Sequence, residues 1–141
     1  MTAHAFTYGS LMWADIMGRV CGREFAGEPA SLAGHRRHPV RGQDYPGLQA
    51  DAAGTVPGVL YRDVTEAAWE RLDAFEGAEY ERVDIVVTLA DGNTLPAQVY
   101  RFRSEFAQRL LPGDWDADAF EREGRARFIA RYAGFDVVAP R

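Results

Sequence analysis

The first segment that could carry chemistry is the tetrapeptide Tyr8-Gly9-Ser10-Leu11. A short β-prone run stops at Gly9, and apolar side chains at helical spacing follow from Leu11 to Val20. This arrangement predicts a strand-to-helix junction with Ser10 at the N-cap. Glycine permits a tight turn, and the first N–H groups of a helix have no partner within it, so they can bind a carboxylate or an oxyanion. A capped turn without function has the same sequence, and the tetrapeptide alone leaves both interpretations open.

A second candidate is Glu76, in the segment Leu72–Gly77. On a helical wheel Glu76 lies about 20° from Trp69, so it borders the apolar face of the predicted helix. Burial and the C-terminal end of a helix both raise the pKa of a carboxyl group, toward the range of a general base at neutral pH. The alternative is a structural ion pair of this carboxylate with Arg71, Arg82 or another cation.

Reactive residues elsewhere are weaker candidates. His35 and His38 lack an acidic third ligand, so we interpret them as part of a solvated basic loop and not as a metal site. The alternating aspartates of residues 114–118 lack the glycine of a calcium loop and are typical of the acidic start of a helix. Ser10 is not in a nucleophile elbow and has no assignable His–Asp pair, and Cys21 has no activating neighbour. The sequence therefore predicts neither a metal site nor a nucleophile.

The composition is that of an ordinary globular domain. The chain has 141 residues, of which 47% are hydrophobic and 26% charged, and this length predicts a single domain over residues 1–141. Its net charge of −5 argues against binding to nucleic acid. There is no apolar run of about 18 residues and no N-terminal signal pattern, so we expect a cytoplasmic protein without a membrane segment. A small molecule or a protein partner remains as the target.

The elements that position these groups are clearest in the middle of the chain. Thr65 is a good N-cap for a helix that ends at Gly77. Apolar and polar side chains alternate over residues 83–89, a turn sequence follows at residues 91–93, and residues 95–102 supply a second strand. The sequence therefore predicts a β-hairpin directly after the helix.

Three other segments complete the expected fold. Residues 27–50 are rich in Gly, Pro and Arg and are interpreted as extended segments and loops, and residues 55–61 as a strand interrupted by a turn or bulge. The tail at about 116–132 predicts an amphipathic helix. Its expected buried face consists of Phe120, Phe128, Ile129 and Tyr132. The expected fold class is α+β: a small mixed, largely antiparallel β-barrel with flanking helices.

Three motifs together resemble the γ-glutamylcyclotransferase-like family. They are Tyr8-Gly9-Ser10-Leu11, Tyr45-Pro46-Gly47-Leu48, and Leu72-Asp73-Ala74-Phe75-Glu76-Gly77 followed by Tyr80 and Arg82. The resemblance extends from about residue 5 to residue 102, and the tail helix matches less specifically. Phe75 before the glutamate is more similar to the γ-glutamylamine and plant avirulence-induced branches than to the branch with Gln there.

The resemblance implies an enzyme that releases 5-oxoproline from a γ-glutamyl compound without a metal or organic cofactor. Carried onto this sequence, it implies that Glu76 is the general acid/base. It also implies a substrate site formed by Tyr8, Gly9, Ser10, Leu11 and Tyr100. The partner is then a small γ-glutamyl molecule, and the amine that it carries and the oligomeric state of the protein are left open.

The implied reaction needs no nucleophile from the protein, because the substrate's own α-amine can reach its γ-carbonyl and form a five-membered lactam. Holding these groups in attack geometry can contribute about 7–11 kcal/mol. One carboxylate can then remove the ammonium proton and protonate the departing amine. Two alternatives remain: a non-catalytic regulatory module that binds a γ-glutamyl group or carboxylate, and an amidohydrolase that yields free glutamate.

Overall fold

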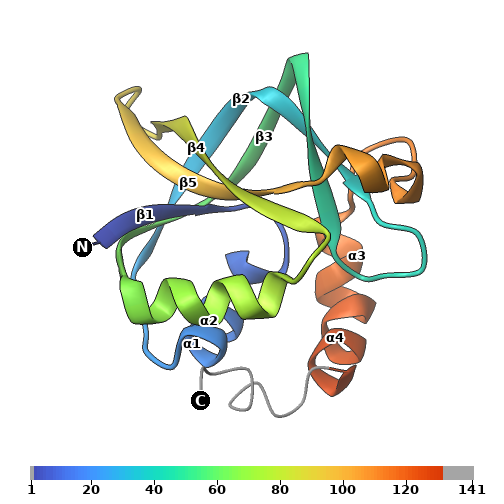
Figure 1. The fold of residues 1–141 in the computed structure, drawn as a ribbon, viewed down its shortest axis with the longest axis horizontal. Helices are drawn as coiled ribbons and strands as arrows, with labels where there is room; N and C mark the ends of the chain where they lie inside the picture. Colours follow the sequence, from blue (N-terminus) through green and yellow to red (C-terminus); the bar gives the residue numbers. More distant parts are fainter. Residues whose placement is uncertain (1, 132–141) are drawn as a thin grey trace.

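Five strands form the centre of the fold in the computed structural model, which describes residues 2–131 (Figure 1). They are β1 (Thr2–Thr7), β2 (Gly27–Pro39), β3 (Pro46–Thr65), β4 (Tyr80–Leu89) and β5 (Thr94–Phe102). In the order β1-β3-β2-β4-β5 each strand pairs antiparallel with the next, and β5 returns to β1 through one parallel pair, Ala5 with Gln98. The sheet closes into a barrel, which confirms the expected α+β, largely antiparallel architecture.

The long hairpin of β2 and β3 agrees with the extended segments and loops expected for residues 27–50. These residues lie mostly in paired strands, because β2 and β3 pair from Gly27 and Tyr61 to Pro39 and Pro46. Pro57 and Gly58 likewise lie inside β3 and do not interrupt it. Their neighbours give the physical reason: a Cβ on Gly58 would lie 2.1 Å from the Thr7 carbonyl oxygen of β1. The glycine allows close strand approach and marks no turn.

Two helical pieces replace the single helix expected after β1. A 3-10 turn, η1 (Ser10–Met12), comes first, and α1 (Ala14–Cys21) begins only after Trp13, whose backbone is extended. The residue at the N-cap of η1 is Gly9, and Ser10 is the first residue of the turn. The expectation that Ser10 caps a helix is therefore wrong.

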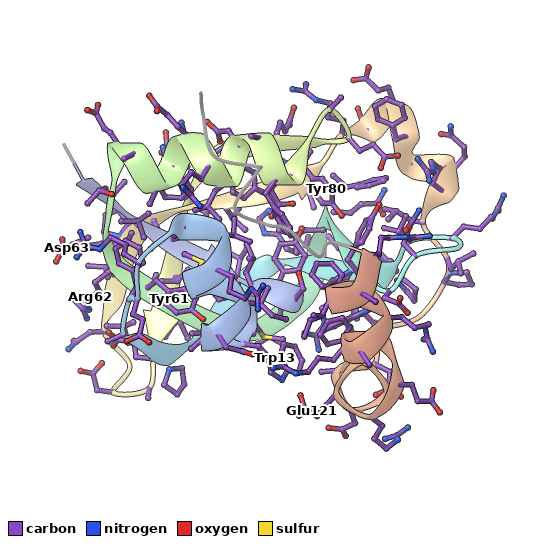
Figure 2. All side chains as sticks on the ribbon, turned by 90° about the horizontal axis from the view of Figure 1, so that it is seen from below. Trp13, Tyr61, Arg62, Asp63, Tyr80 and Glu121 are labelled. Atoms are coloured by element: carbon purple, nitrogen blue, oxygen red, sulfur yellow. The ribbon has the colours of Figure 1, made fainter. Side chains whose placement is uncertain are left out.

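Tyr61 accounts for this break. It is fully buried on β3, and Figure 2 shows it beneath the helical pieces that follow β1. Its hydroxyl donates to the Leu11 carbonyl at 2.7 Å and lies 3.2 Å from the Met12 carbonyl. A buried carbonyl needs a donor, and here a side chain of a distant strand supplies it at the point where the helix is interrupted.

The helix α2 (Glu66–Glu76) forms as its end signals predict. The Thr65 hydroxyl oxygen accepts a hydrogen bond from the Ala68 N–H at 3.2 Å, and Gly77 ends the helix with a φ of +78°. The helix lies beside α1 on one side of the barrel (Figure 1). Its buried residues are Ala68, Trp69 and Leu72.

The predicted β4–β5 hairpin is confirmed. The two strands pair antiparallel from Tyr80 with Phe102 to Thr88 with Thr94, and the turn between them includes Gly92 at a φ of +88°. Because α2 ends at Glu76 and β4 begins at Tyr80, the start of β4 lies close to the C-terminal end of α2.

The C-terminal segment contains a short 3-10 helix and then three consecutive helical pieces. They are η2 (Ser104–Arg109), α3 (Ala117–Ala119), the π-turn η3 (Phe120–Gly124) and α4 (Arg125–Arg131). The Asp116 carboxylate accepts a hydrogen bond from the Ala119 N–H at 3.0 Å. The predicted acidic start of the final helix is therefore confirmed, and the helix contains a π-turn that the sequence did not predict.

The final helix packs as expected over its described part. Phe120 and Phe128 are buried and Ile129 is half-buried. The indole N–H of Trp13 donates to the carboxylate of Glu121, which joins this helix to the region of α1 (Figure 2). Tyr132 lies outside the described residues. Within residues 2–131, no helix has both the length and the apolar character needed to cross a membrane. The single domain over residues 1–141 stays a prediction.

Candidate active site

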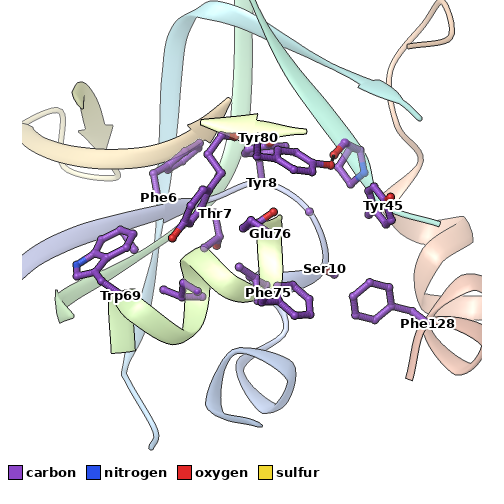
Figure 3. Close-up of a pocket in the computed structure, with 16 residues that line it drawn as sticks. Phe6, Thr7, Tyr8, Ser10, Tyr45, Trp69, Phe75, Glu76, Tyr80 and Phe128 are labelled. Atoms are coloured by element: carbon purple, nitrogen blue, oxygen red, sulfur yellow. Dashed lines mark hydrogen bonds between the residues drawn. The ribbon is translucent and has the colours of Figure 1, made fainter. Parts of the chain in front are cut away.

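A cavity lies between the end of β1, the C-terminal end of α2 and the start of β3 (Figure 3). The space open to the centre of a water molecule is about 70 Å³. All the site residues predicted from the sequence line this cavity: Tyr8, Gly9, Ser10, Leu11, Glu76 and Tyr100. The structure therefore brings together two motifs that are about 65 residues apart in the chain.

Glu76 occupies the last position of α2, and its side chain points into the cavity (Figure 3). The residue as a whole is half-buried, and its carboxyl end is surrounded by the cavity wall. Burial, and to a smaller extent the negative charge of Asp73, raises the pKa of Glu76 from 4.5 to about 8. A carboxyl group with this pKa can both accept and return a proton near neutral pH.

The two cations considered as ion-pair partners for Glu76 are engaged elsewhere. The Arg82 guanidinium pairs with the Asp73 carboxylate at 3.4 Å, and Arg71 donates to the Val20 carbonyl at 2.6 Å. Among the residues that the structure describes, none forms an ion pair or a hydrogen bond with the Glu76 carboxylate. The geometry thus favours the general-base interpretation over the structural one for these partners.

The loop from Tyr8 to Leu11 forms the wall opposite Glu76. A Cβ on Gly9 would lie 2.7 Å from Cδ of Pro46, so a larger residue cannot occupy this position without moving the wall. The Met12 N–H donates to the Gly9 carbonyl at 3.0 Å. Among the described residues, none accepts a hydrogen bond from the N–H groups of residues 9–11. These backbone donors are available to a ligand in the cavity.

Arg37 holds this loop and was missed by the sequence analysis. It is 7% exposed, and its guanidinium donates to the Tyr8 carbonyl at 2.9 Å and to the Asp114 carboxylate at 2.9 Å. In a trans peptide the N–H points opposite to the C=O, so this bond turns the Gly9 N–H away from Arg37. The basic run that contains Arg37 was interpreted as a solvated loop, but it lies on β2. No signal in the sequence paired Arg37 with Asp114.

Two tyrosine hydroxyls connect the loop to α2. The Tyr8 hydroxyl donates to the Tyr100 carbonyl at 2.6 Å, and the Tyr100 hydroxyl donates to the Asp73 carboxylate at 2.6 Å. Burial raises the pKa of both tyrosines well above the ordinary value, so both hydroxyls stay protonated and act as donors. This chain of bonds links the end of β1, β5 and α2, and it fixes the distance across the cavity.

The chain is similar to known proteins over most of its length. The model of the family described as "Gamma-glutamyl cyclotransferase, AIG2-like" matches residues 5–117. The chain belongs to this family. AIG2-like protein D of Arabidopsis thaliana is 29% identical and covers 94% of this chain and 91% of its own length. AIG2-like protein C of the same plant is 28% identical over 125 residues, which cover 88% of this chain and 72% of that protein.

Solved structures agree with this γ-glutamyl cyclotransferase-like fold. A solution structure from Arabidopsis thaliana matches with a TM-score of 0.72 and 27% identity, covering 92% of this chain and 87% of that one. A structure named gamma-glutamyl cyclotransferase matches with a TM-score of 0.65 over 73% of this chain and 68% of that one. At 16% identity, the second likeness shows the fold alone.

The remaining reactive residues of this γ-glutamyl cyclotransferase-like chain lie away from the cavity. Cys21 is buried, and burial raises the pKa of its thiol to about 12, as expected for a core residue. Nδ1 of His38 lies 2.9 Å from the Gly113 carbonyl. The described residues contain no group of three or more His, Cys, Asp or Glu side chains that could hold a metal ion.

Proposed function

We propose that the protein cyclises a γ-glutamyl amide to 5-oxoproline and releases the amine, with Glu76 as general acid and base. The observation that carries this proposal is the Glu76 carboxyl, whose pKa of about 8 is set by burial in a cavity shared with the Tyr8–Leu11 loop. Membership of the γ-glutamyl cyclotransferase, AIG2-like family supports it. The partner in this proposal is a small molecule that carries a γ-glutamyl group.

The substrate binds through its γ-glutamyl group. The backbone N–H groups of residues 9–11 donate to the α-carboxylate or to the γ-carbonyl oxygen, and they need no side-chain rearrangement because Arg37 and Tyr61 already hold the loop. The bound chain folds so that the α-amine approaches the γ-carbonyl carbon. This orientation can supply about 7–11 kcal/mol of the barrier.

Proton transfer by Glu76 then completes the reaction. The Glu76 carboxylate accepts a proton from the α-ammonium group, and the freed amine attacks the γ-carbonyl carbon to form the ring C–N bond. Glu76 returns that proton to the nitrogen of the leaving amine as the second C–N bond breaks. The ring nitrogen gives its surplus proton to the carboxylate, which passes it to the released amine or to solvent. The products are 5-oxoproline and the amine, and no water is consumed.

Product analysis tests this proposal. The protein is incubated with a panel of γ-glutamyl amines and γ-glutamyl dipeptides, and 5-oxoproline, glutamate and free amine are measured. We expect 5-oxoproline and amine in equal amounts from at least one substrate. Free glutamate in place of 5-oxoproline would indicate an amidohydrolase that uses water. Saturable binding without any product would indicate a regulatory binding module.

A further inference from the structure

One side of the cavity is aromatic. Tyr45, Phe75 and Phe128, here called the outer aromatic wall, line the cavity on the opposite side of Glu76 from Trp69 (Figure 3). The ring centres of Phe75 and Phe128 are 6.1 Å apart in an edge-to-face arrangement. Such aromatic pairs present a large apolar surface with little conformational freedom.

Tyr45 and Phe75 of the outer aromatic wall lie at the mouth of the cavity, because both are half-buried, whereas Phe6 and Trp69 at the other end are 2% and 5% exposed. Phe128 is 2% exposed and forms the buried part of the same wall. In the proposed function the γ-glutamyl group binds at the loop, and we place it in the inner part of the cavity with its scissile bond at Glu76. The group on the far side of the scissile bond must then extend toward the mouth. That group is the leaving amine.

Phe128 comes from the C-terminal helix and packs in a cluster of aromatic rings. Its ring centre lies 5.7 Å from that of Phe120, which in turn lies 4.8 Å from Trp13 and 5.4 Å from Trp115. The helix that carries it follows residue 117, where the family match ends. This part of the cavity wall therefore comes from residues beyond those that the family model matches.

Over its described residues, the cavity wall also has no positively charged side chain. The described residues that line it include no Lys, Arg or His, and the one carboxylate is Glu76. A leaving amine with its own carboxylate, such as an amino acid, would place that charge against aromatic rings without a cation to pair with. An apolar substituent instead gains from leaving water against these rings.

We propose that the outer aromatic wall is a leaving-group subsite that selects γ-glutamyl amides of uncharged, apolar amines, preferably aromatic ones. This inference rests on the proposed function. It names the class of amine that the enzyme releases, and it assigns the selection to Tyr45, Phe75 and Phe128.

Three matched substrates test the subsite. γ-Glutamylphenethylamide differs from γ-glutamylethylamide by one phenyl ring, and from γ-glutamylphenylalanine by the absence of one carboxylate. We expect kcat/KM for the phenethylamide to exceed that for each of the other two by at least about tenfold, the lower limit for an apolar group in a complementary pocket. Equal kcat/KM for phenethylamide and ethylamide, or a preference for γ-glutamylphenylalanine, would overturn the proposal.

Substitutions test which residues cause the preference for the phenethylamide. In Phe128→Ala, the ratio of kcat/KM between phenethylamide and ethylamide should fall toward one. Ile129→Ala, on the same helix but not lining the cavity, should keep the wild-type ratio. Because Phe128 is buried, Phe75→Leu provides a second test at a half-buried position, and its ratio should fall as well. If both substitutions at the wall leave the ratio unchanged, the wall does not select the amine.

Binding measurements distinguish a failure of this inference from a failure of the proposed function. If no amide yields 5-oxoproline, the proposed function fails, but calorimetric titration of the same three compounds still measures the subsite. At least about tenfold tighter binding of the phenethylamide than of the ethylamide would support the aromatic subsite in a binding module. Equal dissociation constants would overturn it.

Discussion

The two walls of the cavity are held in place in different ways. Glu76 lies at the end of α2, whose start and end depend on the neighbouring residues Thr65 and Gly77. The Tyr8–Leu11 loop instead depends on bonds to side chains or carbonyls that are 29 to 92 residues away in the chain. Its three partners are Arg37, Tyr61 and Tyr100. Glu76 is thus placed by local sequence, and the loop by tertiary structure.

Because of this difference, we expect substitutions at the two walls to affect turnover and binding separately. A change at Glu76 removes a proton acceptor and leaves the cavity intact, so it should affect turnover. A change that moves the loop displaces the backbone donors, so it should affect binding, even where the changed residue does not line the cavity. The predictions below test this separation.

Gly9→Val should have the largest effect, with loss of detectable 5-oxoproline binding and of turnover. The new Cβ would lie 2.7 Å from Cδ of Pro46, and its two methyl groups need further space, so the loop must move. Calorimetric titration with 5-oxoproline measures the loss, and circular dichroism verifies the fold. Gly18→Ala is the control, because a Cβ there has its nearest atom at 3.8 Å. Normal product binding by Gly9→Val would place the carboxylate site elsewhere.

Glu76→Gln should lower kcat by at least about 10²-fold and leave 5-oxoproline binding nearly unchanged. Glutamine keeps the shape of the side chain but cannot accept the ammonium proton. Steady-state kinetics and titration of the same preparation measure the two effects.

Glu81→Gln is the matched control for Glu76→Gln. Glu81 lies on β4 beyond the end of α2 and pairs with Arg101 and Arg103 at 3.4 Å each, so its variant should stay active. Glu79→Gln should stay active as well. Turnover by Glu76→Gln at the wild-type rate would falsify the assignment of this residue.

Arg37→Met should raise KM roughly tenfold with a much smaller change in kcat. Methionine keeps an apolar stem but leaves the buried Tyr8 carbonyl without its donor, at a cost of about 1–3 kcal/mol. The split between KM and kcat is the readout, because a merely structural residue would lower the amount of active protein and leave KM unchanged. Arg36→Met is the control: Arg36 is exposed and pairs with Asp51 at 2.9 Å, so KM should not change.

The same difference explains which features the sequence could predict. The β4–β5 hairpin and α2 were predicted, because alternation and end signals lie within these segments. Ser10 was misread as an N-cap because the hydroxyl of Tyr61, on another strand, determines the turn. Gly58 suggested an interruption of β3, since its role depends on the Thr7 carbonyl of β1.

The residues of the candidate site also differ in whether the sequence could predict them. Glu76 could be recognised from its place beside the apolar face of α2 and from the family motif. Arg37 could not, because a basic run looks solvated until Asp114 and the Tyr8 carbonyl are known to surround it. The outer aromatic wall was also missed, since Phe128 joins Phe75 only through packing of the final helix.

The pH dependence of stability should distinguish a buried base from an ion-pair partner. With the pKa of Glu76 raised from 4.5 to about 8, the folded protein holds a proton that the unfolded chain has lost over this range. The contribution of Glu76 to stability is then full below about pH 4.5 and is lost as pH rises to about 8.

Glu76→Gln removes this loss of stability at high pH, because glutamine does not ionise. Its Tm should be close to that of the wild type at about pH 4.5 and several degrees higher at about pH 8, as thermal unfolding at both pH values will measure. An ion pair predicts the opposite order at about pH 8, with the wild type more stable. That order would remove the physical basis for Glu76 as a base.

Ser10→Ala should have the smallest effect, a less than about tenfold rise in KM and no change in pH dependence. Ser10 is 7% exposed and lines the cavity, but in the proposed mechanism its contribution is the backbone N–H, which alanine retains. One neutral side-chain hydrogen bond contributes about 0.5–1.5 kcal/mol, and this sets the limit. Ser10→Pro provides the contrast, because Ser10 is the first residue of a helical turn, where proline is generally tolerated, and proline removes the N–H. Steady-state kinetics should therefore show a clearly higher KM for Ser10→Pro than for Ser10→Ala. If Ser10→Ala instead abolished turnover, the hydroxyl itself would take part in the reaction, and the loop would no longer act through its backbone alone.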